Sequence, residues 1–200
     1  SLLEEIATRE VSNPMGSEAR YYLSRGYESA GDMNRALQTY KEITLRATNT
    51  NDLWAIKSAE RLSVLLTPWI EAAIASRDDL TVVSLFHRQG AMAEQRYARS
   101  PVLLNIAESH RRLGFSPEAV RLYQQVLKSS NDSAALEAAL IGLGGIYLDQ
   151  RDPEAARKVL ERYRFQFPIG TYETKVGHLL IEAMRQQRDL QGLLHLCRMW

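Results

Sequence analysis

The chain has 200 residues, of which 45% are hydrophobic and 24% are charged, so it can bury the core of one sizeable domain and is too apolar to be disordered. Its formal net charge of +1 gives no overall field that would attract nucleic acid or a membrane, and no apolar run reaches the roughly 18 residues of a membrane span. The single cysteine, Cys197, excludes an internal disulfide framework.

Polar turns separate apolar segments of helical period along the chain. They centre on Gly31, Arg77, Gly114, Arg151 and Arg188. The last four follow one another at intervals of 37 residues, whereas Gly31 lies 46 residues before Arg77. This spacing predicts a run of helical hairpins, with an insertion of about nine residues that we place in residues 44–62.

The second hairpin is irregular because Pro68 falls where its first helix should run. Inside a helix, proline removes a backbone hydrogen bond and clashes with the preceding turn. We therefore expect a break or kink at Pro68, with a helix before it from about residue 52 to residue 66 and an extra or kinked helix near residues 52–76.

The third and fourth hairpins show most clearly how each unit is built. Ser116 and Asp152 are expected to cap second helices, each followed by a proline at the first helical position. In the fourth unit two apolar stripes face each other, Leu140, Leu143, Gly144 and Tyr147 before the turn and Ala156, Val159, Leu160, Tyr163 and Phe167 after it. Each hairpin must cover its remaining apolar surface with the next one, which predicts a stack.

These residues resemble the tetratricopeptide repeat. The unit from Glu137 supplies its pattern with Leu140, Leu143, Gly144, Tyr147, Ala156, Leu160, Tyr163 and Pro168. The units from Ser17 and Ser100 match strongly, and those near Ser63 and from Thr174 more weakly. The resemblance implies an all-α fold, an α-solenoid forming a right-handed superhelix of about five hairpins. We expect one repeat domain, with units at about 17–50, 51–99 (irregular), 100–136, 137–173 and 174–200, although its period of 37 exceeds the usual 34 of the family.

Residues that could carry chemistry do not form a recognisable site. The four histidines show no metal-binding spacing, and His110 takes a position where the family packs a tyrosine. Cys197 lies on an apolar stripe with no paired base, and Gly142-Leu143-Gly144-Gly145 lacks the lysine of a phosphate loop and fits close helix packing better. We therefore expect no catalysis, no cofactor and no metal.

The resemblance implies that the first helix of each hairpin lines a concave groove for a protein or peptide partner. Carried over by position, the groove residues are Tyr21, Tyr22, Arg25 and Glu28 in the first unit; Leu104, Asn105, Glu108, Arg111 and Arg112 in the third; Ile141, Gly145, Leu148 and Asp149 in the fourth; and His178, Leu179, Glu182 and Arg185 in the fifth. Either Tyr21 or Tyr22 could instead pack on a neighbouring helix. Of the set that clamps chaperone carboxylates only Asn105 is present, so no chaperone partner is expected.

Three rival functions remain open, of which an enzyme with an unrecognised site ranks last. The last helix carries Leu193, Leu196, Cys197 and Trp200 on one stripe, which could make a homodimer or a larger assembly. The basic residues Arg157, Lys158, Arg162 and Arg164 could contact RNA, but Glu154 and Glu161 lie among them and favour a solvated face.

The location of the protein is suggested only by short motifs. Residues 13–23 and 165–172 are similar to repeat starts in bacterial envelope proteins, which favours a bacterial cell-envelope protein without excluding the cytoplasm. Because the chain begins Ser1-Leu2 without an initiator methionine, we expect a fragment of a longer protein.

Overall fold

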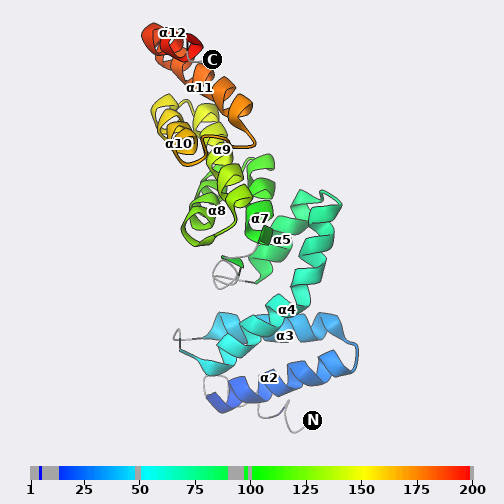
Figure 1. The fold of residues 1–200 in the computed structure, drawn as a ribbon. Coiled ribbons are helices and arrows are strands. Elements are labelled where there is room, and N and C mark those ends of the chain that lie inside the picture. The colour runs from blue at the N-terminus through cyan, green and yellow to red at the C-terminus, as the bar shows by residue number, and fades with distance from the viewer. Residues whose placement is uncertain (1–4, 6–13, 48–50, 90–96, 99–100, 199–200) are drawn as a thin grey trace. The chain divides into compact units, whose positions relative to one another are not determined.

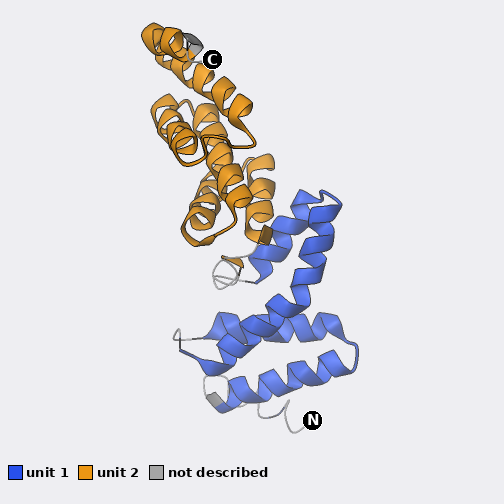
Figure 2. Ribbon diagram, viewed as in Figure 1, with its two compact units in different colours: residues 1–96 blue, residues 97–200 orange. Residues whose placement is uncertain are grey.

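The protein is described by a computed structural model, which covers residue 5 and residues 14–47, 51–89, 97–98 and 101–198 (Figure 1). These residues form ten α-helices and no strand, which confirms the predicted all-α class. The chain divides into two compact units, residues 1–96 and residues 97–200 (Figure 2). Among the described helices, none is both long enough and apolar enough to cross a bilayer. The expectation of one continuous repeat domain stays a prediction.

Unit 1 contains two helical hairpins, α2 with α3 and α4 with α5. Helix α3 also packs against α4, and α2 lies beside α4. The fully buried side chains Tyr40, Leu62, Ile70 and Val82 come from α3, α4 and α5 and form its core. The bounds of the helices are α2 Pro14–Ser29, α3 Met33–Arg46, α4 Leu53–Ala75 and α5 Asp79–Arg88.

Unit 2 contains three hairpins whose helices pack in chain order. Each helix contacts the next, and the first helices of neighbouring hairpins also touch, α7 with α9 and α9 with α11. This sequential packing is the arrangement expected of an α-solenoid. The bounds are α7 Pro101–Arg112, α8 Ser116–Ser129, α9 Ser133–Asp149, α10 Pro153–Gln166, α11 Glu173–Gln187 and α12 Leu190–Arg198.

The predicted turns share one backbone geometry. Gly31 and Gly114 have φ values of 80° and 81°, and Arg77, Arg151 and Arg188 have φ values of 57°, 60° and 58°. At each turn the next residue donates its amide to a carbonyl in the last turn of the preceding helix, as Asp152 N does to Tyr147 O at 2.9 Å. This is the left-handed helix ending that favours glycine. The interval of 37 residues thus corresponds to a repeated structural position.

Aspartate caps the second helix of four hairpins. Asp32, Asp78, Asp152 and Asp189 each accept a hydrogen bond from the amide three residues later, at 2.8–3.2 Å. The third hairpin corrects our expectation that Ser116 is the cap, because Ser116 already lies within α8 and Phe115 takes the cap position without a side-chain hydrogen bond.

Of the break or kink expected at Pro68, the structure shows a kinked helix (Figure 1), whereas the expected helix end near residue 66 is not found. Helix α4 runs through Pro68 without interruption for 23 residues, and its ribbon bends between its two halves (Figure 1). Proline has no N–H for the carbonyl of Val64, which is the local loss that bends helices at proline. The N-terminal part of α4 accommodates the extra residues that the spacing predicted, and no extra helix forms among the described residues of this region.

Candidate functional site

A pocket of about 460 Å³ lies on the first helices of the three hairpins of unit 2. Helices α7, α9 and α11 place its lining side by side, since α9 contacts both neighbours. The floor is apolar and glycine-rich, and the rim is charged. The lining consists of Glu108 and Arg111 from α7; Ala138, Ile141, Gly142, Gly145 and Asp149 from α9; Tyr172 before α11; and Lys175 and Leu179 from α11.

Three glycines of α9 meet different surroundings. A Cβ at Gly142 would lie 2.5 Å from Cζ of the buried Tyr123 ring, and a Cβ at Gly144 would lie 2.7 Å from Cδ2 of Leu160. These two glycines allow α8 and α10 to approach α9 closely, as predicted for Gly144. A Cβ at Gly145 would have no atom within 4 Å. Gly145 therefore keeps the floor of the pocket open.

The carboxylate of Glu108 is held in place by two neighbours. The Tyr123 hydroxyl donates to its Oε1 at 2.5 Å, and the Arg111 guanidinium donates to its Oε2 from Nε at 3.1 Å and from an Nη at 2.9 Å. Burial, together with the charge of Glu108, raises the pKa of Tyr123 far above its usual value, so this hydroxyl keeps its proton. Glu108 and Arg111 consequently form a fixed polar wall of the pocket.

Asp149 and Lys175 are the free charges of the rim. Both side chains are exposed, and neither forms an ion pair or hydrogen bond with another described side chain. An exposed charge without an internal partner can pair with a charge on a ligand and impose specificity on it.

The structure brings together part of the groove expected from the sequence. Glu108, Arg111, Ile141, Gly145, Asp149 and Leu179 share the pocket. Four further lining residues, Ala138, Gly142, Tyr172 and Lys175, were not expected in the groove. Tyr172 lies in the turn before α11, outside the positions that the family pattern covers, whereas Lys175 could have been found one helical turn before His178.

The other expected groove residues of unit 2 lie outside this pocket. Leu148 was expected in the groove, but it is only 6% exposed and packs with Ala156 and Ala183 in the core. The rest lie on α7 or α11: Leu104 and Asn105 half-buried; Arg112 exposed, 3.9 Å from Glu108; His178 exposed; and Glu182 paired with Arg185 at 2.8 Å.

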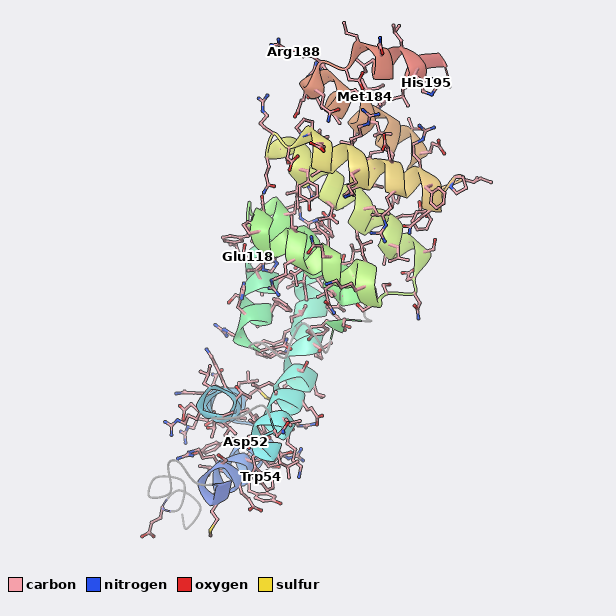
Figure 3. All side chains as sticks on the ribbon, turned by 90° about the vertical axis from the view of Figure 1, so that its left-hand side faces the viewer. Asp52, Trp54, Glu118, Met184, Arg188 and His195 are labelled. Atoms are coloured by element: carbon pink, nitrogen blue, oxygen red, sulfur yellow. The ribbon has the colours of Figure 1, made fainter. Side chains whose placement is uncertain are left out.

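Two of the expected groove residues of unit 1, Tyr21 and Tyr22, form an aromatic cluster with Trp54, which the sequence analysis missed. The ring centroids of Tyr21 and Tyr22 lie 5.3 and 5.7 Å from that of Trp54 and 5.8 Å from each other. Figure 3 labels Trp54 beside Asp52 at the start of α4. Tyr21 also packs on Tyr40, whereas Tyr22 is 50% exposed. The alternative that one tyrosine packs on a neighbouring helix therefore fits Tyr21 better than Tyr22.

Beyond this cluster, Glu28 is tied to the core of unit 1. Its carboxylate accepts hydrogen bonds from the Arg61 guanidinium and from the Tyr40 hydroxyl. The hydrogen bond from Arg61 is the main cause that lowers the pKa of Glu28 below its ordinary value. Glu28 and Arg25, which is exposed, were both expected in the groove, but only Arg25 is available for a partner.

Groups that could support catalysis are scattered. Within the described part of the chain, no group of three or more histidine, cysteine, aspartate or glutamate side chains could hold a metal ion. His110 is fully buried, and its Nδ1 lies 2.8 Å from the Ile106 carbonyl oxygen, which confirms its packing position. The side chain of Cys197 lies outside the described residues.

The expected self-association edge on α12 needs a correction. Leu196 is buried in the core with Leu180 and Met184, and Leu193 is half-buried against it. Trp200 lies outside the described residues. The exposed apolar residues of α12 are instead Leu190 at 71% and Leu194 at 61%.

Comparison with known families agrees with this architecture. A family model described as tetratricopeptide repeat matches residues 104–168, which run from α7 through α10. Comparison with curated proteins finds no match, and the narrower similarity to bacterial envelope proteins gains no support. Tetratricopeptide repeats are generally protein-interaction modules and typically not catalytic. Since the family match and the sequential hairpins coincide over α7–α10, residues 104–168 carry tetratricopeptide repeats.

Proposed function

We propose that the chain is a non-catalytic scaffold that binds a segment of a partner protein in the groove formed by α7, α9 and α11. The observation that carries this proposal is the pocket above Gly145, where an open apolar floor meets the unpaired charges of Asp149 and Lys175. A concave apolar site with a few well-placed polar groups is the usual form of a binding site.

The lining suggests how the groove would recognise its partner. An apolar side chain of the partner would enter over Gly145 and contact Ile141 and Leu179. Full burial of such a side chain contributes roughly 1.5–3 kcal/mol. The carboxylate of Asp149 and the ammonium of Lys175 would then favour partners with a basic and an acidic residue on either side of the apolar anchor, because like charges at these places would repel.

The rival RNA-binding role is less well supported. Arg157 donates to Glu161 at 2.7 Å and to Asp189 at 3.0 Å, so its charge is already balanced. The guanidinium of Arg164 lies 3.9 Å from the carboxylate of Glu173. Lys158 and Arg162 are the exposed members of this set without a partner among the described residues. A nucleic-acid surface would present more cations free to contact phosphates, and binding there would weaken steeply with salt.

The test is to fill the pocket without disturbing the fold. Gly145→Leu places a side chain where no atom lies within 4 Å of the new Cβ, and leucine is a better helix former than glycine. Gln124→Leu adds the same side chain to an exposed position of α8 and serves as the matched control. In affinity capture from a native lysate, Gly145→Leu should lose a specific partner that the wild type and Gln124→Leu retain. Identical partner lists for all three proteins would refute the proposed groove.

A further inference from the structure

We infer that the aromatic cluster of Tyr21, Tyr22 and Trp54 in unit 1 is a second binding site, which takes a proline-rich segment in the polyproline II conformation with acidic residues next to the prolines. This site is separate from the pocket of unit 2. It rests on the protein-binding role proposed above and gives that role a ligand class.

The cluster combines ring surface with unused hydrogen-bond donors. The hydroxyls of Tyr21 and Tyr22 and the indole N–H of Trp54 have no hydrogen-bond partner among the described residues. The Tyr21 hydroxyl and the Trp54 indole N–H are not among the buried side-chain atoms that lack a partner, and Tyr22 is 50% exposed, so a ligand can reach all three donors. Three accessible donors around mutually contacting rings suit a ligand that supplies acceptors.

A polyproline II segment has the chemistry that this site lacks. Its backbone carbonyls make no internal hydrogen bonds, and proline offers no N–H, so the ligand presents acceptors together with flat apolar rings. An α-helical ligand uses most of its backbone carbonyls internally, so it would offer these donors only side-chain acceptors or the carbonyls of its last turn. Proline-rich segments dock in aromatic-lined grooves, where their preformed conformation reduces the entropy lost on binding.

The geometry of the rings argues against stacked nucleic-acid bases. The ring planes of Tyr21 and Tyr22 meet at 78°, and those of Tyr22 and Trp54 meet at 59°. Single-stranded nucleic acid is bound by aromatic faces that stack on successive bases. Because these rings are tilted against one another, they do not offer parallel faces for successive stacked bases, and their edges and faces together form an uneven apolar surface.

The charged side chains around the rings favour a ligand that carries an acidic residue on one side of its prolines. Helices α2 and α4 run in the same direction here, because Tyr21 contacts Trp54 and Glu28 contacts Arg61 further along both helices. Arg25 is exposed one turn after the tyrosines, and the Lys57 ammonium lies 4.5 Å from the Trp54 ring centroid.

The carboxylates near the rings are either neutralised or lie at the opposite end. Glu28 is neutralised by Arg61, and Glu18 lies one turn before the tyrosines, away from Arg25. Asp52 precedes Trp54 at the start of α4, where its carboxylate accepts from the Trp54 and Ala55 amides. An acidic residue of the ligand would therefore bind at the end of the site marked by Arg25 and Lys57.

The test uses the full chain and fluorescently labelled peptides in an anisotropy titration. The probes are decaproline with an aspartate pair at either end, the same peptides with lysines in place of the aspartates, a glycine–serine peptide with the aspartate pair, and a single-stranded oligonucleotide. The protein variants are Tyr22→Phe and Trp54→Phe, each of which removes one donor and keeps a ring. Trp69→Phe is the matched control, because Trp69 is another half-exposed tryptophan of α4.

We expect saturable binding that is tightest for one of the two decaproline peptides with aspartates. Tyr22→Phe and Trp54→Phe should each weaken it about fivefold, the loss of one hydrogen bond, while Trp69→Phe leaves it unchanged. The inference is overturned if no proline peptide binds, if the glycine–serine peptide or the oligonucleotide binds as tightly, or if Trp69→Phe weakens binding as much as Trp54→Phe. Partner loss with Gly145→Leu is measured in the other unit, so either proposal can fail alone.

Discussion

Alanine substitutions at Gly114, in a left-handed turn, and at Gly145, within a helix, together test the geometry of the repeat. Both glycines belong to unit 2, and at neither would a new Cβ meet an atom within 4 Å. They differ in backbone conformation, because Gly114 has a φ of 81° whereas Gly145 lies within helix α9. Alanine at the two positions therefore isolates the backbone effect, with packing the same in both.

The expected effects have opposite signs. At Gly114, alanine must adopt the left-handed conformation at a cost of roughly 1–2 kcal/mol, partly offset by about 0.4–1 kcal/mol because the unfolded chain loses freedom. Gly114→Ala should thus destabilise the protein by about 1 kcal/mol. Gly145→Ala should stabilise it by about 1 kcal/mol, the difference in helix propensity. The two variants should differ by about 2 kcal/mol.

Urea unfolding followed by circular dichroism measures this difference. The transition midpoints should move in opposite directions with an unchanged slope, and the melting temperatures should separate by about 4–8 °C for a chain of this length. Arg151→Gly is the reverse experiment, because Arg151 holds a φ of 60° without the freedom of glycine, and it should raise the midpoint slightly. If both alanine variants shift the midpoint in the same direction, the assignment of these turns is wrong.

Three further results are expected. Gly142→Ala should lower the free energy of unfolding by about 1–3 kcal/mol in the same urea assay, because its Cβ would displace the Tyr123 ring; an unchanged midpoint would contradict this packing. The lowered pKa of Glu28 means that its pairing stabilises the folded state above the ordinary value of 4.5 and ceases to do so as pH falls through the lowered pKa. The gap in melting temperature between wild type and Glu28→Gln should therefore close on acidification, and a constant gap would exclude this linkage. If α12 associates with a second copy, Leu190→Asp or Leu194→Asp should reduce the solution mass measured by light scattering. If the wild type and both variants have the same mass at every concentration, α12 does not mediate association.

The repeat could be predicted because its signals are local. A left-handed turn residue followed by an aspartate cap recurs at Arg77, Arg151 and Arg188, and these features depend on short stretches of chain. Sequence spacing alone therefore placed the hairpins. Phe115 shows where the local rule fails, since Ser116 looked like a better cap than the phenylalanine that occupies the position.

The parts that were missed depend on contacts between distant segments. Trp54 looked like an ordinary residue of an irregular insertion, and only the packing of α4 beside α2 brings its ring to Tyr21. Leu148 has a groove position in the family pattern, but α10 and α11 close over it. At Pro68 local rules allowed either a break or a kink, and helix α4, which packs against α3 and α5, stays continuous through it.

Helix α9 shows how function can be separated from packing at single residues. Each glycine in a helix costs roughly 1 kcal/mol relative to alanine. Gly142 and Gly144 offset this cost, because the Tyr123 ring and the Leu160 side chain occupy the space that a Cβ would need. Gly145 has no such neighbour and lines the pocket. A residue that weakens its helix without improving any contact is the kind of local inconsistency expected at a functional site, so the stabilising change Gly145→Ala should also narrow the space available to a partner.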